Sequence, residues 1–285
     1  MSVVSVQAPA KVNLYLHVTG RRPDGYHLLD SLFVFTTDGD VIRVCDDEKL
    51  SLKITGAYAG ALAGENDNIV LKAARMLAQA GGVSPNAGIT LEKNLPVASG
   101  IGGGSADAAA TLKALSQLWR LNVPADELQK IALNLGADVP SCLASEAVQV
   151  SGIGDVLTPA PRLPELFILL VNPNKPVSTP AVFKSRRPVF SEAAPFTRDV
   201  AGFDEFISAL EQRRNDLCEA ACRLEPDVGK VLQSLSGEPH CRLARMSGSG
   251  GTCFGLFSSF SDAAACCEKI RSIHPEWWFL NTQAV

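Results

Sequence analysis

The stretch Pro96-Val-Ala-Ser-Gly-Ile-Gly-Gly-Gly-Ser-Ala-Asp-Ala-Ala-Ala110 decides the fold, because a glycine-rich loop in it leads into an alanine-rich helix. Residues 89–95 form a strand-like apolar run before the loop, and residues 108–119 repeat apolar side chains at helical spacing after it. Glycines allow φ > 0 and a close approach of the main chain to a ligand, and the free N–H groups at a helix start favour polyanions. The stretch therefore predicts a cradle for the phosphates of a nucleoside triphosphate.

This loop differs from two common phosphate-binding loops. No Gly-Lys-Ser/Thr ends it, so it is not a Walker A loop, and Ser105 stands where a dinucleotide fingerprint beginning at Gly100 needs its third glycine. A flexible glycine turn without a ligand is the remaining alternative. A phosphate cradle predicts that Gly102, Gly103 and Gly104 are glycine for backbone reasons, since a β-carbon there would strain a residue with φ > 0 or collide with phosphate oxygens.

The composition predicts a cytoplasmic protein of two domains. The 285 residues exceed the roughly 250 at which single cores stop growing. A net charge of -4 and a pI near 5.6 argue against broad binding to nucleic acid or to an anionic membrane, so an anionic substrate needs a local positive pocket. No apolar run approaches the ~20 residues of a membrane span, and a signal peptide is not expected.

The eight cysteines fit neither a disulfide framework nor a zinc site. Cys218 and Cys222 are four residues apart, Cys266 and Cys267 are adjacent, and no paired histidines accompany them. We expect reduced, mostly buried thiols with no metal-binding role.

Near the N-terminus, the sequence alternates with a period of two. Lys11, Asn13, Tyr15 and His17 project to one face of a predicted strand and apolar residues to the other. The polar face could carry functional groups or merely meet water. A Pro23-Asp-Gly25 turn and a second strand then predict a hairpin, with Tyr26 and His27 at its mouth.

Helices are predicted after Asn68 and between Pro124 and Gly136, where the apolar residues recur at helical spacing. Asp138 follows in Gly136-Ala-Asp-Val-Pro140, where local sequence favours a simple helix cap. A proline-rich linker over 158–164 precedes a strand at 166–171, and residues 200–231 and 261–271 are predicted to be largely helical.

Three motifs in fixed order resemble the signatures of the GHMP small-molecule kinases: Pro9-Ala-Lys-Val-Asn-Leu14, the stretch from Pro96 to Ala110, and Met246-Ser-Gly-Ser-Gly-Gly251. Two further motifs are Arg22-Pro-Asp-Gly-Tyr-His27 and Ser178-Thr-Pro-Ala-Val-Phe183. Together, the five motifs are similar to those of one branch of this family. That branch phosphorylates the 2-hydroxyl of 4-diphosphocytidyl-2-C-methyl-D-erythritol, on the non-mevalonate route to isoprenoid precursors. The resemblance runs through nearly the whole chain. It implies a two-domain α+β fold with an ATP-binding domain at 1–157, a C-terminal domain at 158–285 that contributes to substrate binding, and the active site in the interdomain cleft.

The resemblance also implies roles for single residues. Asp138 would be the general base toward the acceptor hydroxyl, and Lys11 would orient it, help to keep it ionised and stabilise developing charge. Tyr26 and Phe183 would sandwich cytosine while His27 reads its polar edge, with Asn13 and Thr179 near the substrate. The ATP-binding residues would be Asn68, at the nucleoside end, and the loop residues Pro96, Val97, Ala98, Ser99, Gly100, Ile101, Gly102, Gly103, Gly104, Ser105 and Ala106.

ATP is the implied co-substrate and Mg²⁺ is expected, but its ligands are open. Several members of the family carry Ser-Ser after the glycines, whereas Ala106 and Asp107 follow Ser105 here. Asp107 could complement the helix dipole or reach a metal through water. The rival functions are another GHMP kinase of the homoserine or mevalonate type, which has no use for Tyr26, His27 and Phe183, and a non-catalytic nucleotide-binding relative, which has no use for both Lys11 and Asp138.

Overall fold

The computed structural model describes residues 3–64 and 67–285 and divides into two compact units, each assembled from separate stretches of chain. Unit 1 comprises Met1–Lys11, Asp38–Val97 and Gly102–Ser145, and unit 2 comprises Val12–Thr37, Ala98–Ile101 and Glu146–Val285. These units differ from the expected division at residue 157. The reason is that the long strands β1 (Val3–Arg21) and β2 (His27–Cys45) each contribute residues to both units.

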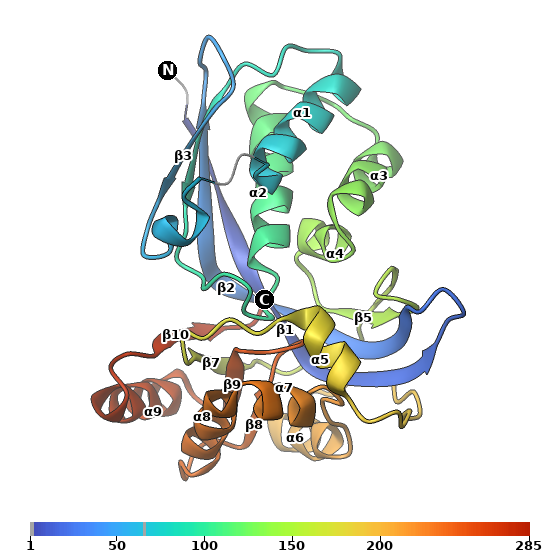
Figure 1. Ribbon diagram of the computed structural model, residues 1–285, viewed down its shortest axis with the longest axis vertical. Coiled ribbons are helices and arrows are strands. Elements are labelled where there is room, and N and C mark those ends of the chain that lie inside the picture. The colour runs from blue at the N-terminus through green and yellow to red at the C-terminus, as the bar shows by residue number, and fades with distance from the viewer. Residues whose placement is uncertain (1–2, 65–66) are drawn as a thin grey trace. The chain divides into compact units, whose positions relative to one another are not determined.

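A sheet with helices beside it builds unit 1 (Figure 1). β2 pairs antiparallel with β4 (Gly88–Glu92) and β1 pairs with β2, while β3 (Ser51–Thr55) runs parallel to β4. The strand expected before the glycine loop is confirmed as β4. The other elements of this unit are a 3-10 helix (Ala59–Leu62), α1 (Ile69–Gly81), α2 (Gly103–Leu118), α3 (Ala125–Leu135) and α4 (Val139–Ala144).

The two central helices of unit 1 follow directly from their sequences. Asn68 caps α1, because its side chain accepts a hydrogen bond of 2.9 Å from the N–H of Val70. In α2, ten residues are buried, half of them alanines, so this helix is enclosed on nearly all sides. Small side chains let a helix approach its neighbours closely, and α2 contacts α1, α3 and α4.

A buried ion cluster fixes the glycine loop to the core of unit 1. The ammonium of Lys93, just beyond β4, lies 2.5 Å from Asp40 on β2 and 2.7 Å from Asp107 in the N-terminal part of α2. Asp40 also accepts hydrogen bonds from the N–H groups of Asn94 and Leu95. The cluster therefore holds both the chain that enters the loop and the helix that leaves it.

Two carboxylates in this cluster share one ammonium. Burial and the like charge of Asp40 raise the pKa of Asp107 to about 7, against the attraction of Lys93. Burial lowers the pKa of Lys93, but the two carboxylates outweigh it and raise the pKa above its ordinary value. Asp107 is thus neither a mere complement to the helix dipole nor free to reach a metal, because its carboxylate is buried and pairs with Lys93.

Unit 2 contains a second sheet with helices packed on it (Figure 1). The first part of β2 pairs with β5 (Val148–Ser151), which pairs with β6 (Val156–Pro159). β6 takes the first residues of the expected proline-rich linker. The second sheet has the antiparallel order β10-β7-β9-β8, and its strands are β7 (Phe167–Asn172), β8 (Leu243–Met246), β9 (Cys253–Phe257) and β10 (Trp278–Gln283).

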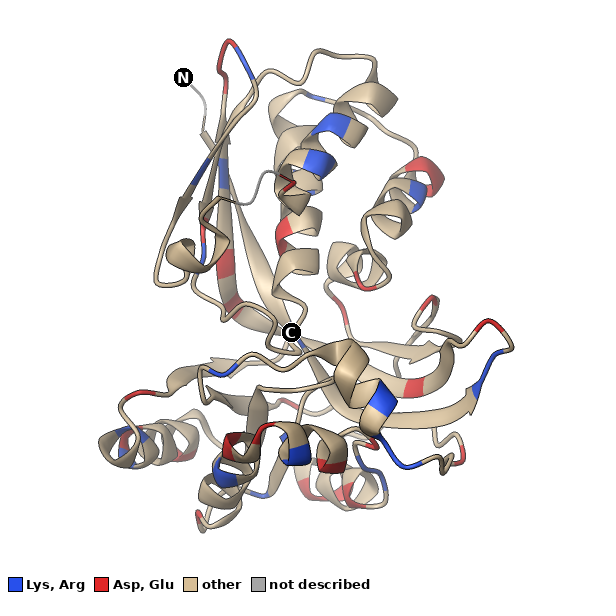
Figure 2. Cartoon of the chain, in the orientation of Figure 1, with Lys and Arg blue, Asp and Glu red and all other residues tan. Residues whose placement is uncertain are grey.

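The helices of unit 2 confirm the helical regions expected at 200–231 and 261–271. They are α5 (Thr179–Ser185), α6 (Phe203–Glu211), α7 (Cys218–Leu224), α8 (Pro226–Ser236) and α9 (Phe260–Ile273). Figure 2 shows acidic and basic residues interspersed on α8 and α9. Their apolar sides pack on the second sheet and enclose the core of this unit.

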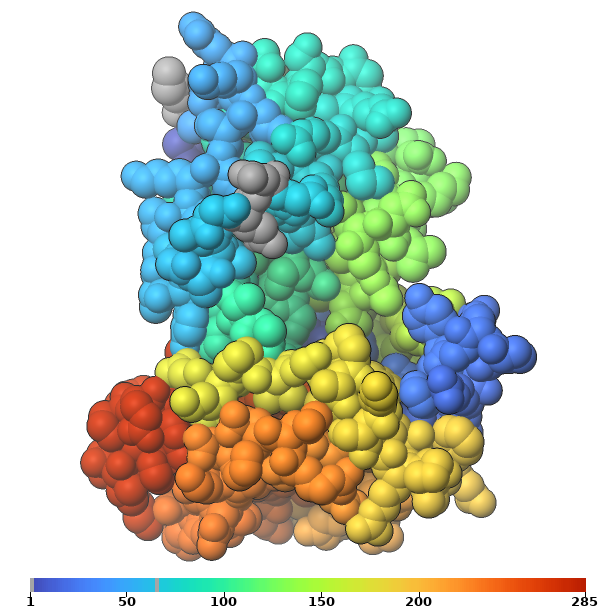
Figure 3. Space-filling view, in the orientation of Figure 1, coloured from blue at the N-terminus to red at the C-terminus, as the bar shows by residue number. Residues whose placement is uncertain are grey.

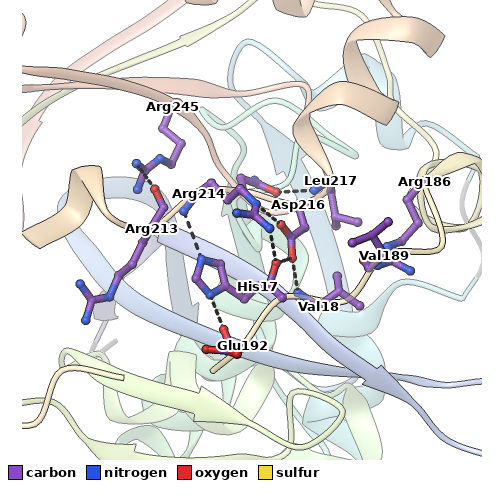
Figure 4. A network of polar contacts seen from close by, with 12 residues as sticks. His17, Val18, Arg186, Val189, Glu192, Arg213, Arg214, Asp216, Leu217 and Arg245 are labelled. Carbon is purple, nitrogen blue, oxygen red and sulfur yellow. Dashed lines mark hydrogen bonds and ion pairs between the residues drawn. The ribbon is translucent and has the colours of Figure 1, made fainter. Parts of the chain in front are cut away.

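The polar face of β1 does not meet water, so that alternative is wrong. Tyr15 and His17 are buried in unit 2, where the strand is packed on both faces. The N–H of Arg214 donates to Nε2 of His17, which leaves Nδ1 to carry the proton and donate to the carbonyl of Glu192 (Figure 4). Asp216 accepts from the N–H of Val18 at 2.8 Å. These contacts tie β1 to segments far away in the sequence.

All eight cysteines are free thiols, four of them buried and four half-buried. Burial raises the pKa of several of them, for example that of Cys142 to about 12. In the part of the chain that the structure describes, no helix has both the length and the apolar composition that crossing a membrane requires.

The buried cluster predicts the effect of removing its cation. We expect Lys93→Met to lower the free energy of unfolding at pH 7 by about 3–5 kcal/mol, because two buried carboxylates lose their partner. The deficit should shrink as the pH falls toward 5. A carboxyl group whose pKa is higher in the folded state than in the unfolded state takes up a proton on folding, so acid favours the folded variant. Urea unfolding at both pH values measures this.

Lys130→Met is the matched control, because Lys130 pairs with Asp126 and Glu127 on the exposed surface of α3. It should leave the free energy of unfolding close to that of the wild type, because exposed ion pairs contribute little to stability. A deficit for Lys93→Met that is as small as this, or that does not depend on pH, contradicts the assigned role of the cluster.

Candidate active site and acceptor pocket

An ion pair in unit 1 joins the first motif to the start of α4. Nζ of Lys11 lies 3.1 Å from Oδ2 of Asp138; the side chain of Lys11 is 6% exposed and that of Asp138 is 33% exposed. The Asp138 carboxylate makes no capping hydrogen bond to α4. The capping alternative is therefore wrong, and the carboxylate faces a buried cation while remaining accessible to a ligand.

Gly102 packs the end of the glycine loop against Lys11. Its φ is +66°, and a β-carbon there would lie 3.2 Å from Cβ and Cε of Lys11. Gly103 is the first residue of α2. The free N–H groups at the start of this helix therefore lie near Lys11 within unit 1. The loop thus brings an anion-binding helix terminus close to the Lys11–Asp138 ion pair.

The positive φ expected as one reason for the three consecutive glycines is present at Gly102 alone. Gly103 has no positive φ; a β-carbon there would come 3.0 Å from the ammonium of Lys93, so space is what restricts it. At Gly104 a β-carbon would meet nothing within 4 Å. Both have the helical conformation of α2, so a positive φ is not the reason for glycine at these two positions, and the collision of a β-carbon with phosphate oxygens stays a prediction.

The middle of the glycine loop packs against the third motif inside unit 2. The hydroxyl of Ser247 donates to the carbonyl of Gly100 at 3.1 Å and accepts from the N–H of Asn13 at 3.1 Å. The carbonyl of Ser99 accepts from the N–H of Thr252. One buried hydroxyl therefore links all three sequence motifs.

Asn13 and Thr179 make specific contacts in unit 2. The side-chain amide of Asn13 donates to the hydroxyl of Ser31 at 3.0 Å, and the residue is buried. The hydroxyl of Thr179 lies 2.6 Å from that of Ser249, so the start of α5 also touches the third motif.

A pocket of about 840 Å³ lies in unit 2 between the β1–β2 turn and the segment that begins with α5. Figure 3 shows this turn (dark blue) beside the yellow segment on the surface. The pocket brings together four of the predicted substrate residues, which are Tyr26, His27, Thr179 and Phe183. Asn13 is not among its lining residues.

Two of the pocket's aromatic rings are already in contact. His27 stacks on Phe183, with 5.0 Å between the ring centroids and 28° between the planes, while Tyr26 is 61% exposed. Burial, Arg186 and Arg21 lower the pKa of His27, in that order of effect. The lowered pKa favours the neutral imidazole of His27, which has one donor and one acceptor nitrogen.

The sequence reasoning missed the cations of this pocket. Arg21, Lys184 and Arg186 line it together with Asp24. Lys184 and Arg186 follow Phe183 closely in the sequence, and Arg21 precedes the Pro23-Asp-Gly25 turn, so closeness to the predicted aromatic residues was the available signal. Figure 2 shows basic residues in this turn, on α5 and just after α5.

Comparison with known proteins gives consistent matches along the chain. Residues 68–146 match the GHMP kinases N terminal domain, and residues 199–275 match the GHMP kinases C terminal domain. The chain is 54% identical over 271 residues to the 4-diphosphocytidyl-2-C-methyl-D-erythritol kinase of Rhodospirillum rubrum, covering 95% of this chain and 89% of that protein. It is 51% identical over 286 residues to the protein of the same name from Paramagnetospirillum magneticum, covering 99% of each.

Solved structures agree with these matches. A crystal structure of 4-(cytidine 5'-diphospho)-2C-methyl-D-erythritol kinase superposes with a TM-score of 0.81 at 33% identity, covering 99% of both chains. The homoserine kinase of Cytophaga hutchinsonii superposes with a TM-score of 0.68 at 17% identity, over 100% of this chain and 95% of that one, which is a likeness of fold alone. The expected α+β GHMP kinase fold is confirmed.

Proposed function

Because the chain belongs to the family of 4-diphosphocytidyl-2-C-methyl-D-erythritol kinases within the GHMP kinases, we propose that it transfers the γ-phosphoryl group of ATP to the 2-hydroxyl of 4-diphosphocytidyl-2-C-methyl-D-erythritol. The observation that carries the proposal is the Lys11–Asp138 ion pair beside Gly102. It combines a proton acceptor, a cation and a helix start, the groups that phosphoryl transfer to an alcohol needs.

In the proposed chemical step, the Asp138 carboxylate takes the proton of the acceptor hydroxyl as its oxygen attacks the γ-phosphorus of ATP. Lys11 orients this carboxylate and stabilises the charge that develops on the phosphoryl oxygens. Phosphoryl transfer depends mainly on positioning and on neutralising charge, so a fixed ion pair suits it. The partial exposure of Asp138 leaves the carboxylate open to the hydroxyl.

Pro96 to Ala106 would hold the phosphates of ATP, with N–H groups at the start of α2 directed at the anion. Asn68 would lie near the nucleoside end. Mg²⁺ in kinase sites is held largely by substrate phosphates with one or two protein oxygens, and it neutralises phosphate charge. Ser105, in the first turn of α2, offers such an oxygen, whereas Asp107 does not fit, since its carboxylate is buried against Lys93.

The pocket in unit 2 would take the cytidine end of the acceptor. Cytosine would stack between Tyr26 and Phe183, with His27 at its polar edge and Thr179 and Asn13 toward the rest of the substrate. Stacking on aromatic faces attracts any flat base, and hydrogen bonds then select among bases. The gathering of Tyr26, His27 and Phe183 in one pocket supports this assignment.

A coupled assay of ADP release tests the substrate. We expect turnover with 4-diphosphocytidyl-2-C-methyl-D-erythritol and none above background with homoserine or mevalonate, because these two small acceptors offer no flat ring for the aromatic pocket. Activity with homoserine or mevalonate alone would contradict the proposal, and activity with none of the three would favour a non-catalytic role.

The chemical step predicts the effect of substitutions in the ion pair. We expect Asp138→Asn and Lys11→Ala each to lower kcat by at least ~100-fold, the scale of a general acid–base contribution. ATP binding, measured by calorimetry, should persist in both variants. Asp126→Asn, which alters an exposed aspartate on α3, is the matched control and should keep the wild-type kcat. Near-normal turnover in either ion-pair variant would rule out the assigned mechanism.

The stacking assignment predicts a separate change in acceptor binding. We expect Phe183→Leu to weaken binding of the acceptor by about 1–3 kcal/mol while KM for ATP stays the same, because leucine keeps the apolar packing but offers no aromatic face. Phe260→Leu, at the exposed start of α9, is the control. Equal changes in both Michaelis constants would assign Phe183 a purely structural role.

A further inference from the structure

The acceptor pocket carries cations that stacking of a base does not explain. Arg21, Lys184 and Arg186 line it, and none of the three has a carboxylate within ion-pair distance among the described residues. Asp24 also lines the pocket, but it pairs with Arg22 at 2.7 Å. Neighbouring basic residues outside the pocket are paired; Arg187, for example, lies 2.8 Å from Glu219. The pocket is therefore a local excess of positive charge on a chain of net charge -4.

Arg186 is held in place and retains an unused donor. Its guanidinium carbon lies 5.1 Å from the centroid of the Phe190 ring, and one terminal nitrogen donates to the carbonyl of Val189 at 2.5 Å (Figure 4). Nε is buried and has no hydrogen-bond partner in the described structure. Because Nε is buried, the terminal nitrogen that does not bind Val189 is the donor that this side chain offers to a ligand in the pocket.

The second feature is the neighbouring imidazole. Burial and the charges of Arg186 and Arg21 lower the pKa of His27, and the other charged groups that line the pocket are Lys184 and the paired Asp24. A neutral imidazole keeps one acceptor nitrogen, which a protonated ring lacks. The pocket thus offers a guanidinium that only donates beside an imidazole that can accept.

The hydrogen-bonding groups of Arg186 and His27 complement the pairing edge of cytosine but not that of uracil. The pairing edge of cytosine presents two acceptors, O2 and N3, and one donor, the N4 amino group. Uracil presents a donor at N3 and an acceptor at position 4 instead. A guanidinium facing N3 would meet a second donor in uracil, and the acceptor of His27 would meet a second acceptor.

We propose that Arg186 determines the base specificity of the acceptor site by donating hydrogen bonds to the O2 and N3 edge of cytosine, so that cytidine is selected over uridine nucleotides. The inference rests on the proposed function, since it places the acceptor's cytosine in this pocket. Arg186 has a second effect, because its charge preserves the acceptor nitrogen of His27 for the N4 amino group.

Binding of CDP and UDP to the whole protein, measured by calorimetry, tests the proposal. We expect the wild-type protein to bind CDP more tightly than UDP. Arg186→Met should weaken the affinity for CDP by roughly 10- to 100-fold and change the affinity for UDP little. Arg186→Lys should recover only part of the preference, because an ammonium lacks the planar fork of donors. Arg187→Met, which removes a paired cation outside the pocket, should behave as wild type. KM for ATP should not change in any variant.

The pH profile provides a readout that a merely structural role would not move. In Arg186→Met the pKa of His27 should rise toward its ordinary value, so CDP binding should weaken further between pH 8 and about pH 6, more than in wild type. NMR titration of the His27 ring measures this shift directly.

Three results would overturn the inference. An unchanged preference in Arg186→Met means that Arg186 does not read the base. If Arg186→Met weakens the binding of CDP and of UDP equally, Arg186 attracts only the diphosphate. Failure of the wild-type protein to bind CDP or to phosphorylate the cytidine substrate overturns the proposed function itself, and it is distinguishable because it appears without any substitution.

Discussion

The close approach of two glycine-rich backbones is the constraint on which the arrangement of the sequence motifs depends. A β-carbon at Gly100 would lie 2.6 Å from the carbonyl oxygens of Ser247 and Gly250, and one at Gly248 would lie 2.7 Å from the carbonyl oxygen of Gly100. These obstacles are backbone atoms, so no side-chain rotation relieves them. The hydroxyl of Ser247, between Gly100 and Asn13, then fixes the register of this contact. Glycine is thus required here by packing as well as by any phosphate.

The flanks of the same loop are held by electrostatics. Lys93 and Asp40 fix its entry, and Asp107 fixes the N-terminal part of α2 within unit 1. Buried ion clusters of this kind add little net stability compared with apolar side chains, but they penalise every arrangement that separates their members. Such a cluster therefore specifies where the start of α2 lies, which is what a phosphate site needs from its scaffold.

Local patterns predicted the elements, and the motifs predicted the family. Asn68 gave the start of α1, and the alternation around Asn13 gave β1, because caps and periodicity act over a few residues. The burial of both faces of β1 and the pairing of Asp107 with Lys93 were not predictable, since each depends on segments that are distant in the sequence. Asp138 shows the same limit. Local sequence favours it as a helix cap, but its carboxylate pairs with Lys11 of β1 and makes no capping hydrogen bond.

The charge of the chain explains why recognition needs a dedicated pocket. With 30 acidic and 26 basic residues, the protein as a whole repels anions weakly, and many of its basic side chains are neutralised by nearby carboxylates. Arg21, Lys184 and Arg186 instead face a pocket whose one lining carboxylate is paired elsewhere. Burial first, and then the charges of Arg186 and Arg21, lower the pKa of His27, so the cations that would attract the diphosphate of the proposed acceptor also favour the neutral imidazole. In the proposed acceptor site, charge attraction and base recognition would therefore act through neighbouring side chains of one pocket.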